Sequence, residues 1–184
     1  MFLAQKEILG RVKNGSIRLK PFSKDQLGSA AYDLRLHQNF RVFVGAETHI
    51  DVKEPFDVTK LKRVKLGGAF VIHPGEFVLA STLEEVSLPG DLMGVLEGRS
   101  SLGRIGLIVH ATAAFIGPGF AGHLTFEMSN ISSLPIQLYA GMRVAQLAFA
   151  TLSSTVPLSR GTAKSRYQDQ APPTPSKIWQ DFEK

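Results

Sequence analysis

The chain of 184 residues is long enough for one domain with a sizeable core, and 43% of its residues are hydrophobic while 20% are charged. No apolar run approaches the roughly 20 residues that a membrane-spanning helix needs, and the N-terminus lacks the apolar segment of a signal peptide. Cysteine is absent, which excludes disulfides and thiolate zinc sites and favours a reducing, cytoplasmic setting.

The net charge of +5 is unevenly distributed along the chain. Residues 1–70 contain 13 Lys and Arg against 7 Asp and Glu, whereas residues 71–150 contain 3 against 6. A basic surface suits phosphorylated ligands or nucleic acid, but no run of basic residues is interleaved with aromatic ones. We therefore expect neither nucleic acid nor a membrane as a partner, and we expect most lysines to be solvated.

The first two elements in chain order are a helix and a strand. Residues 2–14 place apolar side chains at helical spacing and are followed by Gly15, which predicts one short amphipathic helix. Residues 29–45 then alternate, with Tyr32 and Leu34 on one face and Asp33 and Arg35 on the other. This alternation predicts a half-buried strand.

Short apolar runs separated by turn sequences make up the rest of the chain to about residue 154. The turn sequences are at 73–76, 88–91, 117–119 and 140–141, where Pro fixes φ or Gly supplies a positive φ. Many short strands between such turns predict a mainly β fold, either a sandwich or a barrel. The proline-rich residues 171–184 cannot form a central strand, so we expect a tail or an arm that lies over another part.

The stretch LEGRSSLGRIG, residues 96–106, places Arg99 and Arg104 around Ser100 and Ser101 in a segment with few charges. Guanidinium groups, hydroxyls and the N–H groups at the start of a short helical turn would together bind an anion such as phosphate. The alternative is a serine that caps the turn beside arginines in ordinary surface ion pairs. The residues alone leave both interpretations open.

Glu127 is the second candidate, because it stands in the strongly apolar segment HLTFEMSN, residues 123–130. If Leu124 and Phe126 face one side of a strand, then Thr125 and Glu127 share the other. A carboxyl group in a partly desolvated pocket suits proton transfer, whereas the alternative is a glutamate on a solvent-facing strand. No histidine spacing indicates a zinc site, and we expect His73 and His110 to be structural.

These segments together resemble the dCTP deaminase family of the dUTPase-like superfamily. The resemblance rests on EGRSSLGRIG followed by PGFAGHLTFE, with AAYDLRL upstream and RYQDQAPPTPS downstream, and it covers nearly the whole chain. It implies a distorted β-barrel or jelly roll with a short N-terminal helix, as one domain over residues 1–184. Residues 158–184 would form a C-terminal arm that closes over the active site.

The resemblance also implies a homotrimer with active sites between subunits. The substrate would be dCTP or dUTP with Mg²⁺ bound through the triphosphate, and dTTP is a candidate inhibitor. The matching positions suggest catalytic roles for four residues: Glu127, Ser100, Arg104 and the backbone carbonyl of Ala113. Further positions match substrate-binding residues: Arg99, Ser101, Ile116, Gly117, Phe120, Thr125, Arg166 and Gln170.

The chemistry implied by the resemblance agrees with the composition. Zinc-dependent nucleobase deaminases hold their metal with His and Cys, and this chain has no cysteine. Glu127 would instead take a proton from water and return it to the leaving ammonia. Ser100 and the carbonyl of Ala113 would hold that water in place.

Three positions depart from the family pattern. Gly117 stands where the family has an aspartate that contacts the sugar 3′-hydroxyl, Leu158 where it has a tyrosine, and Arg166 where it has a lysine. We therefore expect deamination of dCTP to dUTP and ammonia to be the main reaction. One alternative, which the tail favours, is a bifunctional enzyme that continues to dUMP and pyrophosphate. A second is a diverged member that acts on another deoxynucleotide or mainly as a dUTPase. A third is a non-catalytic nucleotide-binding trimer.

Overall fold

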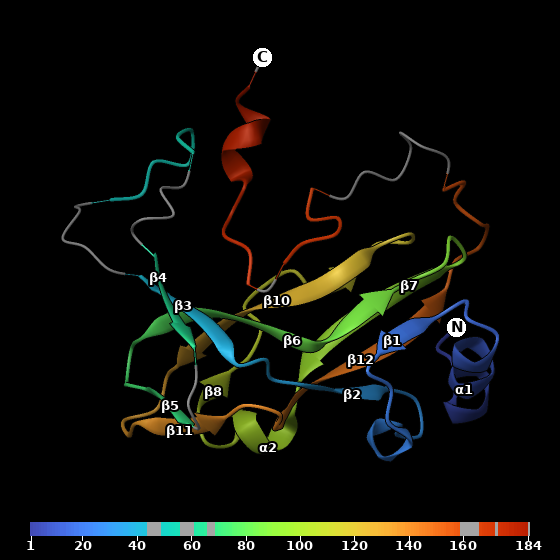
Figure 1. The fold of residues 1–184 in the computed structure, drawn as a ribbon, viewed down its shortest axis with the longest axis horizontal. Helices are drawn as coiled ribbons and strands as arrows, with labels where there is room; N and C mark the ends of the chain where they lie inside the picture. The colour runs from blue at the N-terminus through green and yellow to red at the C-terminus, as the bar shows by residue number, and fades with distance from the viewer. Residues whose placement is uncertain (44–48, 56–60, 66–68, 159–165, 172, 184) are drawn as a thin grey trace.

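The N-terminal helix and the predominance of strands agree with the sequence-based prediction (Figure 1). The computed structural model describes residues 1–43, 49–55, 61–65, 69–158, 166–171 and 173–183, with the backbone alone for 61–65. Helix α1 spans Gln5–Lys13, buries Ile8, and is followed by Gly15 with φ of 79°. The left-handed backbone at Gly15, which glycine adopts without a steric cost, stops the helix where predicted.

Antiparallel strands in three sheets form the body of the protein. In the largest sheet, neighbouring strands follow the order β4 (Leu61–Lys65), β3 (Asn39–Phe43), β6 (Phe77–Ser87), β10 (Ala121–Asn130) and β8 (Leu107–Ile108). Strand β1 (Arg18–Lys20) also pairs with β6. In the second sheet, neighbouring strands follow the order β2 (Tyr32–Arg35), β12 (Arg143–Thr151), β7 (Leu92–Gly98) and β9 (Phe115–Ile116). In the third sheet, β5 (Ala69–Ile72) pairs with β11 (Ile136–Tyr139). The short helical turns are η1 (Lys24–Gln26), α2 (Ser100–Gly103) and η3 (Ile178–Asp181). The prediction of a mainly β, distorted jelly-roll fold is confirmed.

The predicted turns join strands of different sheets. Gly75, Gly119 and Gly141 have φ values of 78°, 78° and 81°, and they connect β5 to β6, β9 to β10 and β11 to β12. In each case the second strand belongs to another sheet than the first. The predicted strand 29–45 is likewise two strands, β2 and β3, in different sheets, and its last two residues lie outside the described residues.

The core lies between the inward faces of these sheets. Tyr32 and Leu34 of β2, Phe40 of β3, Phe126 of β10 and Phe149 of β12 are fully buried. Burial of each such side chain stabilises the fold by roughly 1.5–3 kcal/mol. The alternation along β10 buries Leu124, Phe126 and Met128 and leaves the side chains between them half-buried, which gives this strand a second face toward a pocket.

The C-terminal arm runs back along the start of β10. Gln170 forms a parallel bridge with Gly122, the amide of Asp169 donates to the carbonyl oxygen of Ala121 at 2.8 Å, and the side chain of Gln170 donates to the carbonyl oxygen of His123 at 2.6 Å. Residues 159–165 and 172 of the predicted arm lie outside the described residues. None of the helices in the described parts of the chain is long and apolar enough to cross a membrane.

Candidate active site

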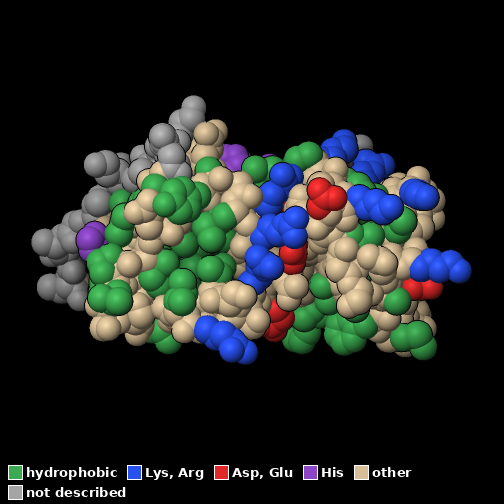
Figure 2. Space-filling view, turned by 90° about the horizontal axis from the view of Figure 1, so that it is seen from below, with side chains coloured by type: hydrophobic (Ala, Val, Ile, Leu, Met, Phe, Trp, Pro, Cys, Tyr) green, Lys and Arg blue, Asp and Glu red, His purple; other side chains and the backbone are tan. Residues whose placement is uncertain are grey.

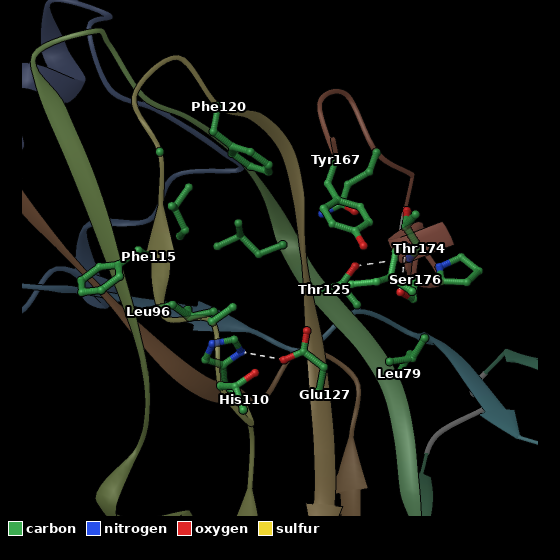
Figure 3. Close-up of a pocket in the computed structure, with 18 of the residues that line it drawn as sticks. Leu79, Leu96, His110, Phe115, Phe120, Thr125, Glu127, Tyr167, Thr174 and Ser176 are labelled. Atoms are coloured by element: carbon green, nitrogen blue, oxygen red, sulfur yellow. Dashed lines mark hydrogen bonds and ion pairs between the residues drawn. The ribbon is translucent and has the colours of Figure 1, made fainter. Parts of the chain in front are cut away.

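A pocket of about 580 Å³ opens between the two larger sheets, below the C-terminal arm (Figure 3). Leu96 of β7 forms one side, and Leu79 of β6 with residues of β10 forms the other. The remaining lining comes from Phe43 of β3, Phe77 of β6, residues 110–120 and the arm. Its described residues are Phe43, Phe77, Leu79, Leu96, His110, Thr112, Ala113, Phe115, Ile116, Gly117, Phe120, Leu124, Thr125, Glu127, Tyr167, Gln170, Thr174, Pro175, Ser176 and Ile178.

Thr125 and Glu127 project from the same face of β10 into this pocket. Glu127 Oε2 lies 2.8 Å from Nδ1 of His110, which follows β8 and reaches the pocket from the opposite side (Figure 3). The side chain of His110 is only 8% exposed and that of Glu127 is 32% exposed. The pair therefore lies where a small molecule that enters the pocket can reach the carboxylate.

The electrostatics of this pair follow from its geometry. The neighbouring Glu127 carboxylate raises the pKa of the His110 imidazole above its ordinary value, although desolvation by burial acts in the opposite direction. The backbone carbonyl of Ala113 and the more distant Glu97 add to the increase. When His110 is protonated, its ring forms an ion pair with the Glu127 carboxylate across this 2.8 Å contact.

Phe120 lies at the other end of the pocket from Glu127 (Figure 3). Ile116 and Gly117, which precede it in the chain, also line the pocket, and the three residues form an apolar wall. The amide of Phe120 donates to the carbonyl oxygen of Gly117 at 3.3 Å, which closes a four-residue turn. Pro118 in the second position and Gly119 with φ of 78° in the third fit a type II turn. Ile116 and Phe120 are thereby held with buried side chains against the pocket.

The arm supplies the upper part of the pocket. The amide of Thr174 donates to Thr125 Oγ1 at 3.3 Å, so the arm is attached to the middle of β10. The hydroxyl of Tyr167 accepts a hydrogen bond from the amide of Lys177 at 3.1 Å, which joins the two limbs of the arm. Tyr167 and Gln170 thus face the cavity from a segment that is anchored on both sides.

The structure brings together only part of the predicted site. Seven predicted residues line the pocket: Ala113, Ile116, Gly117, Phe120, Thr125, Glu127 and Gln170. Five do not: Arg99, Ser100, Ser101, Arg104 and Arg166.

The arginine and serine run lies at α2, on the opposite side of the molecule from the arm (Figure 1). The residue before the turn is Arg99, and no serine side chain caps it. Arg99 lies 3.9 Å from Asp33 of β2 in an ion pair, and Arg166 pairs with Asp181 in η3. Within one chain, therefore, neither arginine reaches the pocket.

Sequence reasoning gave no functional role to His110, Tyr167 or Thr174, which all line the pocket. Each reaches it through long-range contacts: His110 through Glu127, and Thr174 through Thr125. The local pattern around His110 contained no metal-binding or triad spacing to single it out. Only the position of the ring opposite β10 reveals the pair.

Comparison with known proteins identifies the family. The model of the dCTP deaminase-like family matches residues 2–152. The chain belongs to the dCTP deaminase-like family. A relative from Corynebacterium kroppenstedtii, named "dCTP deaminase, dUMP-forming", is 50% identical over 99% of this chain and 100% of its own length. A protein of the same name from Salinispora arenicola is 47% identical over 99% of this chain and 97% of its own. The prediction of an enzyme of the dCTP deaminase family is thereby confirmed.

The fold of this dCTP deaminase-like protein also resembles a solved structure. The 2′-deoxycytidine 5′-triphosphate deaminase from Agrobacterium tumefaciens matches with a TM-score of 0.64 and 24% identity over 80% of this chain. The match spans 47% of that longer chain. At this identity the likeness supports the shared mainly β fold.

The prediction that dUTP is the end product is wrong, because the relatives that match over the whole length are named dUMP-forming. The prediction gave too much weight to Gly117 and Leu158, two positions at which a single side chain differs from the family pattern. The arm, on which the dUMP-forming alternative rested, is docked against β10 through Asp169 and Gln170. The features of the tail were therefore the better guide to the product.

Proposed function

We propose that this protein is a dUMP-forming dCTP deaminase, which converts dCTP and two waters to dUMP, pyrophosphate and ammonia. The observation that carries the proposal is the Glu127 carboxylate, ion-paired with His110 inside a pocket that suits a nucleoside. Full-length similarity to relatives named for this activity supports it.

The first step is hydrolytic removal of the cytosine amino group. Glu127 accepts a proton from a water as the water oxygen bonds to C4 of cytosine and the C4=N3 π electrons move to N3. Glu127 then gives this proton to the amino group, the C4–N4 bond breaks to release ammonia, and the remaining water proton moves from O4 to N3 to give uracil. His110 keeps the carboxylate oriented toward the ring, and Ala113, which also lines the pocket, offers its carbonyl to the water. Positioning of the water thus contributes to the rate together with proton transfer.

The second step cleaves the triphosphate of the dUTP formed. The oxygen of a second water bonds to the α-phosphorus, and the bond from this phosphorus to the α–β bridging oxygen breaks, which leaves dUMP and pyrophosphate. Among the described residues no three His, Asp or Glu side chains converge on one point. We therefore assign Mg²⁺ to the phosphate oxygens of the substrate, where it would neutralise their charge.

The triphosphate requires cations, and the described residues that line the pocket do not offer any. None of the described lining residues is Arg or Lys, whereas Arg99 and Arg104 flank the exposed turn α2. We propose that a second copy places its α2 segment at this pocket within a homotrimer. Figure 2, seen from below, shows basic side chains beside a hydrophobic surface. Ile105, which follows α2, and Ile131, whose amide donates to the carbonyl oxygen of Gly106, are more than half exposed, as is Leu134. Such an apolar surface beside charged groups suits contact with another copy.

The proposal is tested by ammonia release from dCTP in the presence of Mg²⁺. We expect Glu127→Gln to lower the rate by at least about 100-fold, because the amide cannot accept the proton from water. Glu85→Gln is the matched control, since Glu85 is exposed on β6 and does not line the pocket. Its activity should equal that of the wild type.

Two results would contradict the proposal. One is ammonia release by Glu127→Gln at the wild-type rate, which would show that the Glu127 carboxylate takes no part in the reaction. The other is tight binding of dCTP by the wild type without any turnover, which would favour a nucleotide-binding role instead.

A further inference from the structure

The peptide group between Pro173 and Thr174 in the arm is held at both ends by side chains of two different strands. Nε of Arg41 in β3 donates to the carbonyl oxygen of Pro173 at 2.8 Å, and Oγ1 of Thr125 in β10 accepts from the amide of Thr174 at 3.3 Å. This carbonyl and this amide belong to one planar unit. The two contacts, which we call the clamp, therefore fix the orientation of the unit as well as its position.

The clamp lies beside the pocket, on one face of the largest sheet. Arg41 stands opposite Leu79 in the register of β3 with β6, and the alternation along β3 places it on the same face as Phe43. Phe43, Leu79 and Thr125 all line the pocket. Pro173 is buried and Arg41 is half-buried, so the arm packs against this face at the clamp.

The two limbs of the arm are attached to the body in different ways. The first limb, residues 166–171, docks on the start of β10 through its own main chain and the side chain of Gln170. The second limb, residues 173–183, supplies the roof of the pocket, which consists of Thr174, Pro175, Ser176 and Ile178. Arg41 holds this second limb from the body. A substitution of Arg41 therefore acts on the roof and leaves the contacts of the first limb in place.

The position of the roof affects the fate of the intermediate in the proposed reaction. The dUTP formed in the first step is either cleaved or released, and the ratio of these two rates determines which product leaves the protein. A segment that stays over the pocket commits a bound intermediate to the next step. Loss of a hydrogen bond from a charged donor weakens the docking of such a segment by about tenfold or more.

We infer that Arg41 is a positioning residue that keeps the roof over the pocket through both steps, so that dUTP is cleaved before it leaves. The inference rests on the proposed function. Arg41 acts through the main chain of Pro173 rather than on the reacting atoms. It therefore determines which product is released and has little effect on the rate of deamination.

The test measures ammonia, pyrophosphate and dUTP at initial rates with excess dCTP. Ammonia counts each deamination and pyrophosphate counts each completed second step, so the ratio of pyrophosphate to ammonia should be close to one for the wild type. Arg41→Met keeps the hydrocarbon stem and removes the donor. We expect it to release ammonia within about twofold of the wild-type rate, while at least about a fifth of the deaminated nucleotide leaves as dUTP.

A second measurement follows the second limb without any reaction. Trp179 is the only tryptophan in the sequence, and it lies in η3 within this limb. Acrylamide should quench its fluorescence more strongly in Arg41→Met than in the wild type. Arg18→Met is the matched control, because Arg18 is exposed on β1 of the same sheet, opposite Ser87 of β6. Both its product ratio and its quenching should equal those of the wild type.

A product ratio near one in a folded Arg41→Met variant, or unchanged quenching of Trp179, would overturn the inference. Equal losses of ammonia and pyrophosphate would overturn it as well, because they would show a general structural effect without release of dUTP. If the wild type releases no ammonia from dCTP, the proposed function fails. The quenching of Trp179 then still decides whether Arg41 holds the second limb.

Discussion

At the scale of single residues, the pocket depends on the contact between Glu127 and His110. The strand period predicted that Thr125 and Glu127 share a face, and both line the pocket. That period contains no information about which side chain lies opposite, so the 2.8 Å contact with His110 could not be predicted from the sequence. Gly117 was singled out by comparison with a family pattern, whereas the open space around it follows from the fold and not from the local sequence.

The His110 pair predicts a pH-dependent stability. Because the pKa of His110 is raised above 6.5 in the folded state, the protonated ring stabilises the fold fully below pH 6.5. This contribution is lost as the pH rises through the raised value. His110→Asn should therefore lower the free energy of unfolding by about 1 kcal/mol near pH 6, and by less at about pH 9.

Urea denaturation at several pH values measures this difference. His73→Asn is the control, since His73 is exposed in the turn after β5, and it should show no comparable pH dependence. A loss of stability in His110→Asn that grows with pH would contradict the account. Glu127→Gln should remove most of the pH dependence, because it removes the main cause of the raised pKa.

At the scale of elements, the turns could be predicted from the sequence, but the pairing of the strands that they connect could not. The sequences around Gly75, Gly119 and Gly141 mark the ends of strands through backbone chemistry that is local. Strand pairing is decided by contacts far apart along the chain, and here each of these turns passes from one sheet to another. The docking of the arm on β10 is a tertiary interaction of the same kind.

Glu84 of β6 shows how one buried side chain ties three elements together. It is fully buried and accepts hydrogen bonds from Gln26 of η1 at 2.9 Å and from the backbone amide and Nε of Arg35 in β2 at 2.8 and 2.7 Å. Glu84→Gln replaces an acceptor with a donor and leaves the guanidinium of Arg35 without its carboxylate. We expect it to lower the free energy of unfolding by about 3 kcal/mol.

The neighbouring Glu85→Gln is the matched control for this prediction, because Glu85 lies on the exposed face of the same strand. Its effect should stay within about 0.5 kcal/mol in the same urea denaturation experiment. Equal effects of the two substitutions would show that the burial of Glu84 is not what stabilises the contact between the sheets.

At the scale of the whole molecule, the candidate site is divided between two places. The pocket holds Glu127 and His110, whereas Arg99 and Arg104 do not line it and flank α2, which lies on the opposite side of the molecule from the arm (Figure 1). In the proposed function, a single chain therefore has the proton-transfer group in one place and the phosphate-binding group in another. A symmetric trimer would bring one of each together at every contact between copies.

Production of dUMP from dCTP by a mixture of two inactive variants tests this account most directly. Glu127→Gln and Arg104→Ala should each form almost no dUMP alone. Co-expressed as mixed trimers in equal amounts, they should restore roughly a quarter of the wild-type rate, because a quarter of the contacts then unite an intact Glu127 with a neighbour's intact Arg104. No dUMP above the level of the single variants, or wild-type enzyme that releases dUTP as its end product, would contradict the account.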